Sequence, residues 1–187
     1  MTAKRVGILG SAFNPPTLGH LDVLDQTQEL FDLILLVPSA AHAFSKQMLP
    51  FHHRVAMCQQ LVKSVQFPHC QVQVSEIEHA MWTDNPEQPV YTFDLLELLE
   101  RQFPGDQLGF IRGPDNASPQ TWKRFYRSED IEKRWQIFTA SERQNIRSSQ
   151  VRELLVSGNF DDNIKEDLAA LLLPSVYEYI LQHHLYQ

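Results

Sequence analysis

The sequence predicts an α/β fold in which a parallel sheet is covered by helices on both faces, with a helical C-terminal part. Three observations predict it. Short apolar runs alternate along the chain with segments whose apolar residues recur every three or four positions, as in strands followed by amphipathic helices. Most of the runs are continuously apolar, which is typical of strands buried on both faces. The last third loses the alternation and is mainly helical in pattern.

Two strand and helix units are predicted in the first third of the chain. Residues 6–10 form a short apolar run that ends at a glycine, and after a turn-rich stretch a helical pattern starts at about Leu18. A second apolar run covers residues 33–37 and ends at Pro38. Residues 51–65 are predicted to form a helix, because their apolar positions recur at spacings of four, three, four and three.

The middle of the chain repeats the same order. Residues 71–77 alternate in polarity as a strand does, and residues 92–103 have the apolar spacing of a helix. Residues 108–111 are predicted to form another strand, which ends before a Gly-Pro turn. Between these elements, residues 80–89 are predicted to be a mobile loop.

The last third is predicted to be mainly helical. Residues 135–140 fit one more strand, and helices are predicted over residues 148–157, 164–172 and 175–184. No linker, repeat or low-complexity tract interrupts the sequence, so residues 1–187 are predicted to form a single domain. Sheets of this kind bind ligands at the carboxyl ends of their strands, and the candidate site residues are expected there.

Composition and charge argue against several classes of protein. Sixteen Lys and Arg against 23 Asp and Glu give a net charge of −7, so we expect no nucleic acid as a partner. A few local donors can still hold a small phosphate group. Cys58 and Cys70 are too few for a disulfide framework, and the histidines show no metal-ligand spacing. The apolar run at residues 6–9 is too short for a signal peptide or a membrane span, so we expect a cytoplasmic protein without membrane contact.

The turn after the first strand is a candidate phosphate site. Thr17 and His20 are three residues apart at a helix start and therefore project toward the same side. A phosphate placed there would meet unpaired backbone N–H groups, the positive end of the helix dipole and an imidazole N–H. Gly19 removes a side chain beside the phosphate, while Gly10 and Ser11 let the strand end turn sharply. The alternative is that Thr17 only caps the helix and His20 is a partly buried helical histidine.

A second candidate anion site begins the helix predicted at residues 148–157. Ser148 and Ser149 place two hydroxyls at its N-terminus, and Arg152 follows one turn later. The alternative is a serine-capped surface helix. The presence of both patterns in one chain favours the phosphate sites.

Residues 10–20 resemble the signature of the nucleotidyltransferase superfamily, in which glycine, phenylalanine, a polar residue and proline precede a His-x-Gly-His tetrad. The matching residues are Gly10 or Ser11, Phe13, Asn14, Pro15, Gly19 and His20. Thr17 stands where the tetrad has its first histidine, and a hydroxyl can donate a hydrogen bond but cannot carry positive charge. The resemblance implies a Rossmann-like fold in which His20, Thr17 and Arg152 are the catalytic residues.

Further matches to this superfamily assign binding residues. Residues 145–152 are similar to its Ile-Ser-Ser-Thr-x-Ile-Arg motif, although Arg147 stands where a serine is usual. The resemblance implies that ATP is bound by Gly10, Ser11, Phe13, Gly19, His20, Lys46, Ser148, Ser149 and Arg152. It implies that a mononucleotide acceptor is bound by Asn14, Tyr91, Thr92, Gly113, Asp115 and Trp122. The alternatives are that Asp115 is only a turn residue, Trp122 only a core residue and Lys46 only solvated. Arg54 matches a family arginine in the helix after this lysine.

The C-terminal residues 173–186 resemble the Pro-x-x-Val-x-x-Tyr-Ile-x-x-His-x-Leu-Tyr string of nicotinate- and nicotinamide-mononucleotide adenylyltransferases. The resemblance implies adenylyl transfer from ATP to a pyridine mononucleotide in NAD biosynthesis, with Mg²⁺ as the cofactor that shields the triphosphate. Two alternatives stay open, namely nucleotidyl transfer to another phosphorylated acceptor and a non-catalytic nucleotide-binding protein. The segment between Trp122 and Ser148 is shorter than is usual in the family, which bears on the choice of acceptor. The sequence determines neither nicotinate against nicotinamide preference nor whether the chain forms a homo-oligomer.

Overall fold

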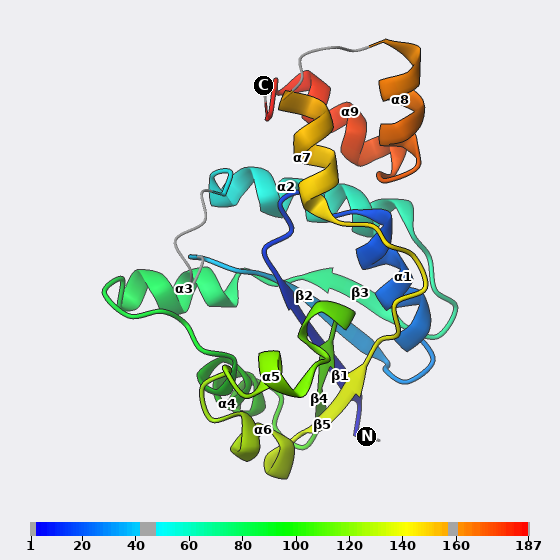
Figure 1. Cartoon of the computed structure of the whole chain (residues 1–187). Coiled ribbons are helices and arrows are strands. Elements are labelled where there is room, and N and C mark those ends of the chain that lie inside the picture. Colours follow the sequence, from blue (N-terminus) through cyan, green and yellow to red (C-terminus); the bar gives the residue numbers. More distant parts are fainter. Residues whose placement is uncertain (1–2, 42–47, 157–160, 187) are drawn as a thin grey trace.

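Five parallel strands form the centre of the protein. The computed structural model describes residues 3–41, 48–156 and 161–186. The strands in this part of the chain are β1 (Arg5–Ser11), β2 (Leu33–Pro38), β3 (Gln71–Val74), β4 (Gln107–Arg112) and β5 (Gln136–Thr139). They lie in the order β3-β2-β1-β4-β5, and every neighbouring pair is parallel (Figure 1). The predicted parallel α/β fold is confirmed.

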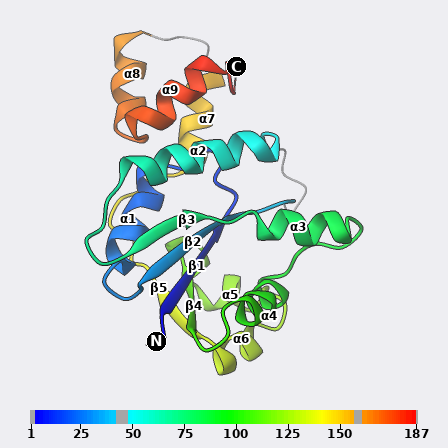
Figure 2. The ribbon, with the colours of Figure 1, turned by 180° about the vertical axis from the view of Figure 1, so that it is seen from behind.

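Helices cover both faces of this sheet (Figures 1 and 2). The described helices are α1 (Leu18–Thr27), α2 (Phe51–Ser64), α3 (Ile77–Asp84), α4 (Thr92–Gln102), α5 (Pro119–Trp122), α6 (Ser128–Arg134), α7 (Ser148–Val156), α8 (Asp162–Ala169) and α9 (Pro174–Gln182), with a short 3₁₀ helix at Pro114–Asn116. One apolar core joins the sheet to α1, α2 and the C-terminal α7 to α9. The other joins it to α3, α4, α5 and α6. Among the described helices, none is long and apolar enough to cross a membrane.

The central strand β2 shows how the two cores share one strand. Leu33, Leu35 and Val37 face the core formed with α3 to α6. Ile34 and Leu36 face the core formed with α1, α2 and the C-terminal helices. Successive side chains of a strand point to opposite faces, so both faces of β2 must be apolar. This is the physical reason for the uninterrupted apolar run that predicts a buried strand.

Two glycines hold β1 and β4 close to the segment before β2. Gly7 of β1 and Gly109 of β4 are register partners. A Cβ atom at Gly7 would lie 2.9 Å from the Phe31 ring, and one at Gly109 would lie 2.8 Å from it. The Phe31 ring also meets Phe138 of β5 edge-on, with the ring centroids 4.8 Å apart. The glycines therefore make room for an aromatic pair beneath the two strands whose carboxyl ends carry the candidate site.

The C-terminal helices bind back to the beginning of the chain. The Leu18 N–H at the start of α1 donates to the Leu171 carbonyl over 2.9 Å. The Tyr186 hydroxyl donates to Asn14 Oδ1 over 2.8 Å, and Asn14 lies in the loop between β1 and α1. α9 packs along α2, where the hydroxyl oxygens of Ser64 and Ser175 are 2.7 Å apart. The loop after β1 is thus fixed by residues more than 150 positions later in the sequence.

The structure corrects the predicted boundaries around residue 77. The third strand ends at Val74 instead of residue 77, and α3 begins at Ile77. The expected mobile loop at residues 80–89 is wrong for its first half, because α3 continues to Asp84. Ile77 and Met81, one turn apart, pack into the core shared with α4. The helix stops one residue before Asn85, which precedes a proline, and that position disfavours helical backbone.

Other boundaries differ for related reasons. The sequence predicts no helix between residues 112 and 134, whereas the 3₁₀ helix, α5 and α6 lie there. Each is too short to show an apolar period, so tertiary contacts such as the burial of Ile131 define it. The helices predicted at 148–157, 164–172 and 175–184 are α7, α8 and α9; α7 begins at Ser148 as predicted, and the ends of α8 and α9 are shifted by one to three residues. Residue 157 lies outside the described residues.

Candidate functional site

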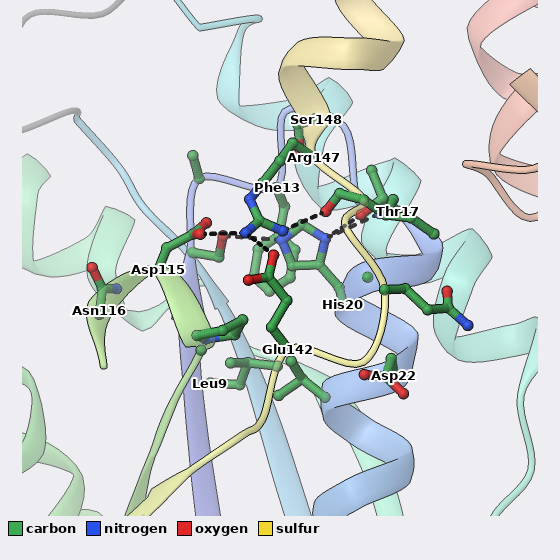
Figure 3. A pocket seen from close by; sticks show the side chains of 18 of the residues that line it. Leu9, Phe13, Thr17, His20, Asp22, Asp115, Asn116, Glu142, Arg147 and Ser148 are labelled. Carbon is green, nitrogen blue, oxygen red and sulfur yellow. Dashed lines mark hydrogen bonds and ion pairs between the residues drawn. The ribbon is translucent and has the colours of Figure 1, made fainter. Parts of the chain in front are cut away.

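A cavity of about 390 Å³ lies at the carboxyl ends of β1 and β4. These neighbouring strands mark the place where the strand order reverses, since the chain runs outward from β1 to β3 and then returns to β4. Open parallel sheets bind their ligands at such a switch point. The cavity walls come from the loop after β1, the start of α1, the turn after β4 and the segment that leads into α7 (Figure 3).

Most of the residues predicted from the sequence meet at this cavity. Those lining it are Gly10, Ser11, Phe13, Asn14, Thr17, Gly19, His20, Gly113, Asp115, Ser148, Ser149 and Arg152. They come from both of the predicted phosphate motifs and from the Gly-Pro-Asp turn. Tyr91, Thr92 and Trp122 do not line the cavity. Lys46 lies outside the described residues.

The His20 ring is held by hydrogen bonds on both nitrogens. Its Nδ1 accepts from the Thr17 backbone N–H over 3.0 Å and lies 3.0 Å from Thr17 Oγ1. Its Nε2 lies 3.1 Å from Ser11 Oγ (Figure 3). A backbone N–H can only donate, so Nδ1 is unprotonated and a neutral ring carries its proton on Nε2. The predicted proximity of Thr17 and His20 is confirmed, and their arrangement directs an N–H toward Ser11 at the end of β1.

Electrostatics favour this neutral ring. Burial, and to a smaller extent the neighbouring Arg147 guanidinium, lowers the pKa of His20 to about 4. The Phe13 ring packs against the imidazole with centroids 4.8 Å apart, and Phe13 itself is buried with a left-handed φ of 45°. A non-glycine residue in that conformation is strained and persists only where packing holds it. Near neutral pH, His20 is therefore an uncharged hydrogen-bond donor.

The second motif holds the first one in place. Ser148 Oγ, at the first residue of α7, donates to the Pro15 carbonyl over 2.7 Å. Arg152 Nη1 donates to the Asn14 carbonyl over 2.7 Å. These bonds join the start of α7 to the loop that precedes α1, across more than 130 residues of sequence. The N-termini of two helices, α1 and α7, consequently border one cavity, and both favour an anion there.

Close packing around residue 19 gives a further reason for a glycine at this position, one that the sequence alone does not show. A Cβ atom at this position would lie 2.9 Å from the Ile146 carbonyl oxygen and 3.4 Å from Thr17 Oγ1. The first of these is a backbone atom and cannot turn away as a side chain can. Gly19 therefore permits the segment before α7 to approach α1, in addition to leaving space in the cavity.

Arg147 forms an ion-pair cluster at the cavity that the sequence analysis did not predict. Its Nη2 lies 2.9 Å from Asp115 Oδ1 and also contacts Glu142 Oε1. Figure 3 shows the guanidinium beside the His20 ring, between the two carboxylates. The sequence signal for Arg147 was its departure from the family motif, whereas Glu142 belongs to no motif at all. The other cavity-lining residues outside the predicted set include Asp22, Met48, Asn116 and Arg143.

Three of the residues predicted for the acceptor, Tyr91, Thr92 and Trp122, do not line the cavity, whereas Asn14, Gly113 and Asp115 do. Trp122 of α5 is buried against Phe110 and Phe125, with the Arg112 guanidinium over its ring at 4.8 Å. Its Nε1 is buried and has no hydrogen-bond partner within the described part of the chain. Tyr91, which precedes α4, is 39% exposed and its ring contacts Tyr126. Their role in acceptor binding, like that of Thr92 at the start of α4, stays a prediction.

The family-matched Arg54 is a buried structural residue. It is 1% exposed, and its guanidinium donates to the Ala12 carbonyl over 2.9 Å and to the Leu49 carbonyl over 3.0 Å. Asn14 is similarly committed, because its Oδ1 accepts from both Leu49 N–H and Tyr186 hydroxyl. Both side chains thus hold the loop after β1 in shape. Arg54 does so from outside the cavity, and Asn14 does so from the cavity wall.

Comparison with known proteins places this geometry among nucleotidyltransferases. The model of the cytidylyltransferase-like family matches residues 8–154. The probable nicotinate-nucleotide adenylyltransferase of Myxococcus xanthus (strain DK1622) is 35% identical over 133 residues, which cover 69% of this chain and 65% of that protein. The one from Bacillus pumilus (strain SAFR-032) is 28% identical over 98% of this chain and 99% of its own length. A crystal structure from Vibrio parahaemolyticus that carries the name nicotinate-nucleotide adenylyltransferase has a TM-score of 0.79 and 32% identity, covering 98% of this chain and 95% of that one.

Proposed function

Because the chain belongs to the cytidylyltransferase-like family, we propose that it transfers the adenylyl group of ATP to nicotinate mononucleotide. The products are the dinucleotide and pyrophosphate, and the reaction is a step of NAD biosynthesis. The names of the Myxococcus, Bacillus and Vibrio relatives support adenylyl transfer and favour nicotinate over nicotinamide. Under this proposal, the protein acts in the cytoplasm.

The single observation that carries the proposal is the junction of two helix N-termini at the cavity. The start of α1 presents His20 Nε2, and the start of α7 is bonded to the loop before α1 through Ser148 and Arg152. Backbone N–H groups, helix dipoles and a fixed imidazole N–H are the groups that hold phosphate oxygens. A triphosphate is the part of ATP that needs such a site.

The reaction is a direct displacement at the α-phosphorus. An oxygen of the mononucleotide 5′-phosphate attacks, a new P–O bond forms, and the bond to the bridging oxygen of the β-phosphate breaks to release pyrophosphate. The neutral His20 donates its Nε2–H to a non-bridging oxygen of the α-phosphate, replacing its bond to Ser11. Thr17 acts through the His20 ring, because its N–H bonds Nδ1. Catalysis then consists of orientation and charge stabilisation, as in phosphoryl transfer generally.

Magnesium enters this proposal as part of the MgATP complex. The described residues contain no group of three or more His, Cys, Asp or Glu placed to hold a metal. Asp115 and Glu142 nevertheless lie at the cavity with their carboxylates facing Arg147. Mg²⁺ is commonly held by substrate phosphates together with one or two carboxylates, and Asp115 and Glu142 could supply these carboxylates. When bound, the ion supplies positive charge to the triphosphate.

An acceptor screen tests the proposal directly. The protein is mixed with MgATP and either nicotinate mononucleotide, nicotinamide mononucleotide or phosphopantetheine, and both pyrophosphate and the adenylylated product are measured. We expect pyrophosphate release with the pyridine mononucleotides, fastest with nicotinate mononucleotide, and none with phosphopantetheine. Release with phosphopantetheine alone would assign another acceptor. Absence of release with all three, together with measurable ATP binding, would identify a nucleotide-binding protein and overturn the enzymatic proposal.

A further inference from the structure

We propose that Arg147 contacts the ATP phosphates and supplies the positive charge that Thr17 cannot provide at the helix entrance. This inference rests on the proposed function, because ATP is the ligand it concerns. Arg147 stands where the family motif has serine, and Thr17 stands where the tetrad has histidine. Both departures line the same cavity, one in the first motif and one in the second.

The position of the guanidinium is the first argument. Arg147 comes directly before α7, and its backbone N–H donates to Gln150 Oε1 over 2.6 Å, which fixes the residue at the helix start. From there its side chain reaches the cavity, where it lies beside His20 (Figure 3). His20 donates toward Ser11, so the guanidinium and the imidazole N–H border the same space. A phosphate that accepts from His20 would also be within the reach of a flexible arginine side chain.

The charges of the other cavity groups are the second argument. His20 is neutral near pH 7 because burial depresses its pKa to about 4. Arg152 donates to the Asn14 carbonyl and so is partly occupied by the loop after β1. Arg143 Nη1 lies 3.2 Å from Asp25 and 3.6 Å from Asp22, on an exposed edge. The Arg147 guanidinium lies beside His20 and makes no bond to the loop after β1; apart from its carboxylate partners, it donates to the adjacent Ile146 carbonyl over 3.2 Å.

The present partners of Arg147 are easily exchanged. Asp115 is 64% exposed and Glu142 is 47% exposed, and ion pairs between exposed groups contribute little to stability. Two carboxylates around one guanidinium leave a net negative charge, which repels a triphosphate unless the guanidinium turns to meet it. Phosphate oxygens match the fork of N–H donors as well as carboxylates do. Entry of ATP therefore replaces a carboxylate by a phosphate on Arg147 at little energetic cost.

Substitution by the family residue tests the contact. We expect Arg147→Ser to raise the dissociation constant of MgATP and to lower kcat/KM for ATP, each by about tenfold or more, with unchanged Tm. Arg147→Lys should keep most of the MgATP affinity and most of kcat/KM, because it keeps the positive charge. Arg147→Gln should lose both, because it removes the charge. Arg134→Ser is the matched control. Its guanidinium also lies between two carboxylates, those of Glu97 and Glu100, but it does not line the cavity.

The link to Thr17 is tested in a double-mutant cycle. Thr17→His restores the residue of the tetrad, so the loss caused by Arg147→Ser should be at least about fivefold smaller in this background than in the natural one. Equal losses in the two backgrounds would overturn the compensation. Thr17 is buried, and Thr17→His is used only if its circular dichroism and Tm match the parent. If it does not fold, the comparison of the Lys and Gln variants decides, and equal activity of the two would overturn the charge argument.

The inference and the proposed function fail in different ways. MgATP binding by calorimetry needs no acceptor, so it reports on Arg147 independently of turnover. If Arg147→Ser binds MgATP and turns over as well as the natural protein, the inference is overturned and the proposed function stands. If the natural protein releases no pyrophosphate with any acceptor but its ATP affinity depends on Arg147, the phosphate contact stands and the enzymatic proposal falls.

Discussion

The phosphate end of the cavity and the region around Trp122 differ in what holds them together. At the phosphate end, which is the region around Ser11, His20, Ser148 and Arg152, the contacts are polar. His20 lies 3.1 Å from Ser11, and Ser148 and Arg152 each donate over 2.7 Å to carbonyls of the loop after β1. Around Trp122, rings pack against rings and the indole Nε1 has no described partner. Hydrogen bonds require particular donor and acceptor atoms, whereas ring packing requires shape and an apolar surface. The motif residues at the phosphate end therefore line the cavity and bond one another's segments, whereas the contacts of Trp122 are packing contacts outside the cavity.

Removing the imidazole is the strongest way to test the phosphate end. We expect His20→Ala to lower kcat by about 10²- to 10³-fold, since removing one preorganised donor costs about 2.7–4 kcal/mol of transition-state stabilisation. The measurement is steady-state pyrophosphate release with saturating MgATP and nicotinate mononucleotide. His69→Ala, at an exposed position outside the cavity, is the control and should retain full turnover. Near-normal turnover of a folded His20→Ala protein would remove His20 from the proposed mechanism.

Gly19 tests whether the two motifs depend on close contact. We expect Gly19→Ala to lower the free energy of unfolding by about 1–3 kcal/mol, because its Cβ would press on the Ile146 carbonyl and shift the segment before α7. Chemical denaturation measures this. Gly113→Ala is the matched control, since Gly113 has a φ of −68° and a Cβ there meets nothing within 4 Å. Equal stabilities of the two variants would show that the segment yields freely.

Trp122 tests the other end of the comparison. We expect Trp122→Phe to lower the free energy of unfolding by about 1 kcal/mol, since it removes part of a buried ring, and to change KM for nicotinate mononucleotide by less than about twofold. Denaturation and acceptor-dependent kinetics on the same protein separate the two effects. A several-fold rise in KM with unchanged stability would instead place the indole in the acceptor site, as the family resemblance implies.

The protonation of His20 gives the smallest and most direct test. We expect its ring to stay neutral from pH 8 to below pH 5, because its pKa is lowered to about 4 from an ordinary value near 6.5. NMR titration, with the signal assigned by comparison with His20→Gln, measures this pKa. Between pH 6.5 and 4 the unfolded chain then binds more protons than the folded one, so this contribution to stability falls as the pH falls. The natural protein should lose more Tm than His20→Gln over that range, and titration of His20 near 6.5 would contradict the neutral-donor mechanism.

The pattern of apolar residues was sufficient to locate the strands that are buried on both faces. β1, β2 and β4 are buried on both faces, and their apolar runs locate them to within one or two residues. It failed where an element depends on tertiary contacts. α6 is held by Ile131 in the core and by the ion pairs of Arg134 to α4, neither of which has a local signal. α3 was not predicted, because Trp82 within it and Asn85 and Pro86 directly after it were taken to indicate a loop.

The candidate site was predictable where chemistry requires a fixed residue type at a fixed spacing. Thr17 and His20 share a helix face by their spacing alone, and the serines of α7 follow from a helix start. The pairing of Arg147 with Asp115 and Glu142 could not be read in the same way, because three segments distant in sequence bring these charges together. The reason for Gly19 was likewise only partly visible, since the Ile146 carbonyl lies on another segment.

The bonds from Asn14 to Arg152 and Tyr186 set an order of events during synthesis on the ribosome. The turn after β1 leaves the ribosome early, yet its carbonyl and amide oxygens wait for partners that are translated more than 130 residues later. A nascent chain that ends before α7 can hold the loop after β1 only through earlier residues such as Leu49 and Arg54, which bond Asn14 and Ala12. The final hydrogen bonding of this loop therefore requires α7 and the C-terminal residues to have been translated.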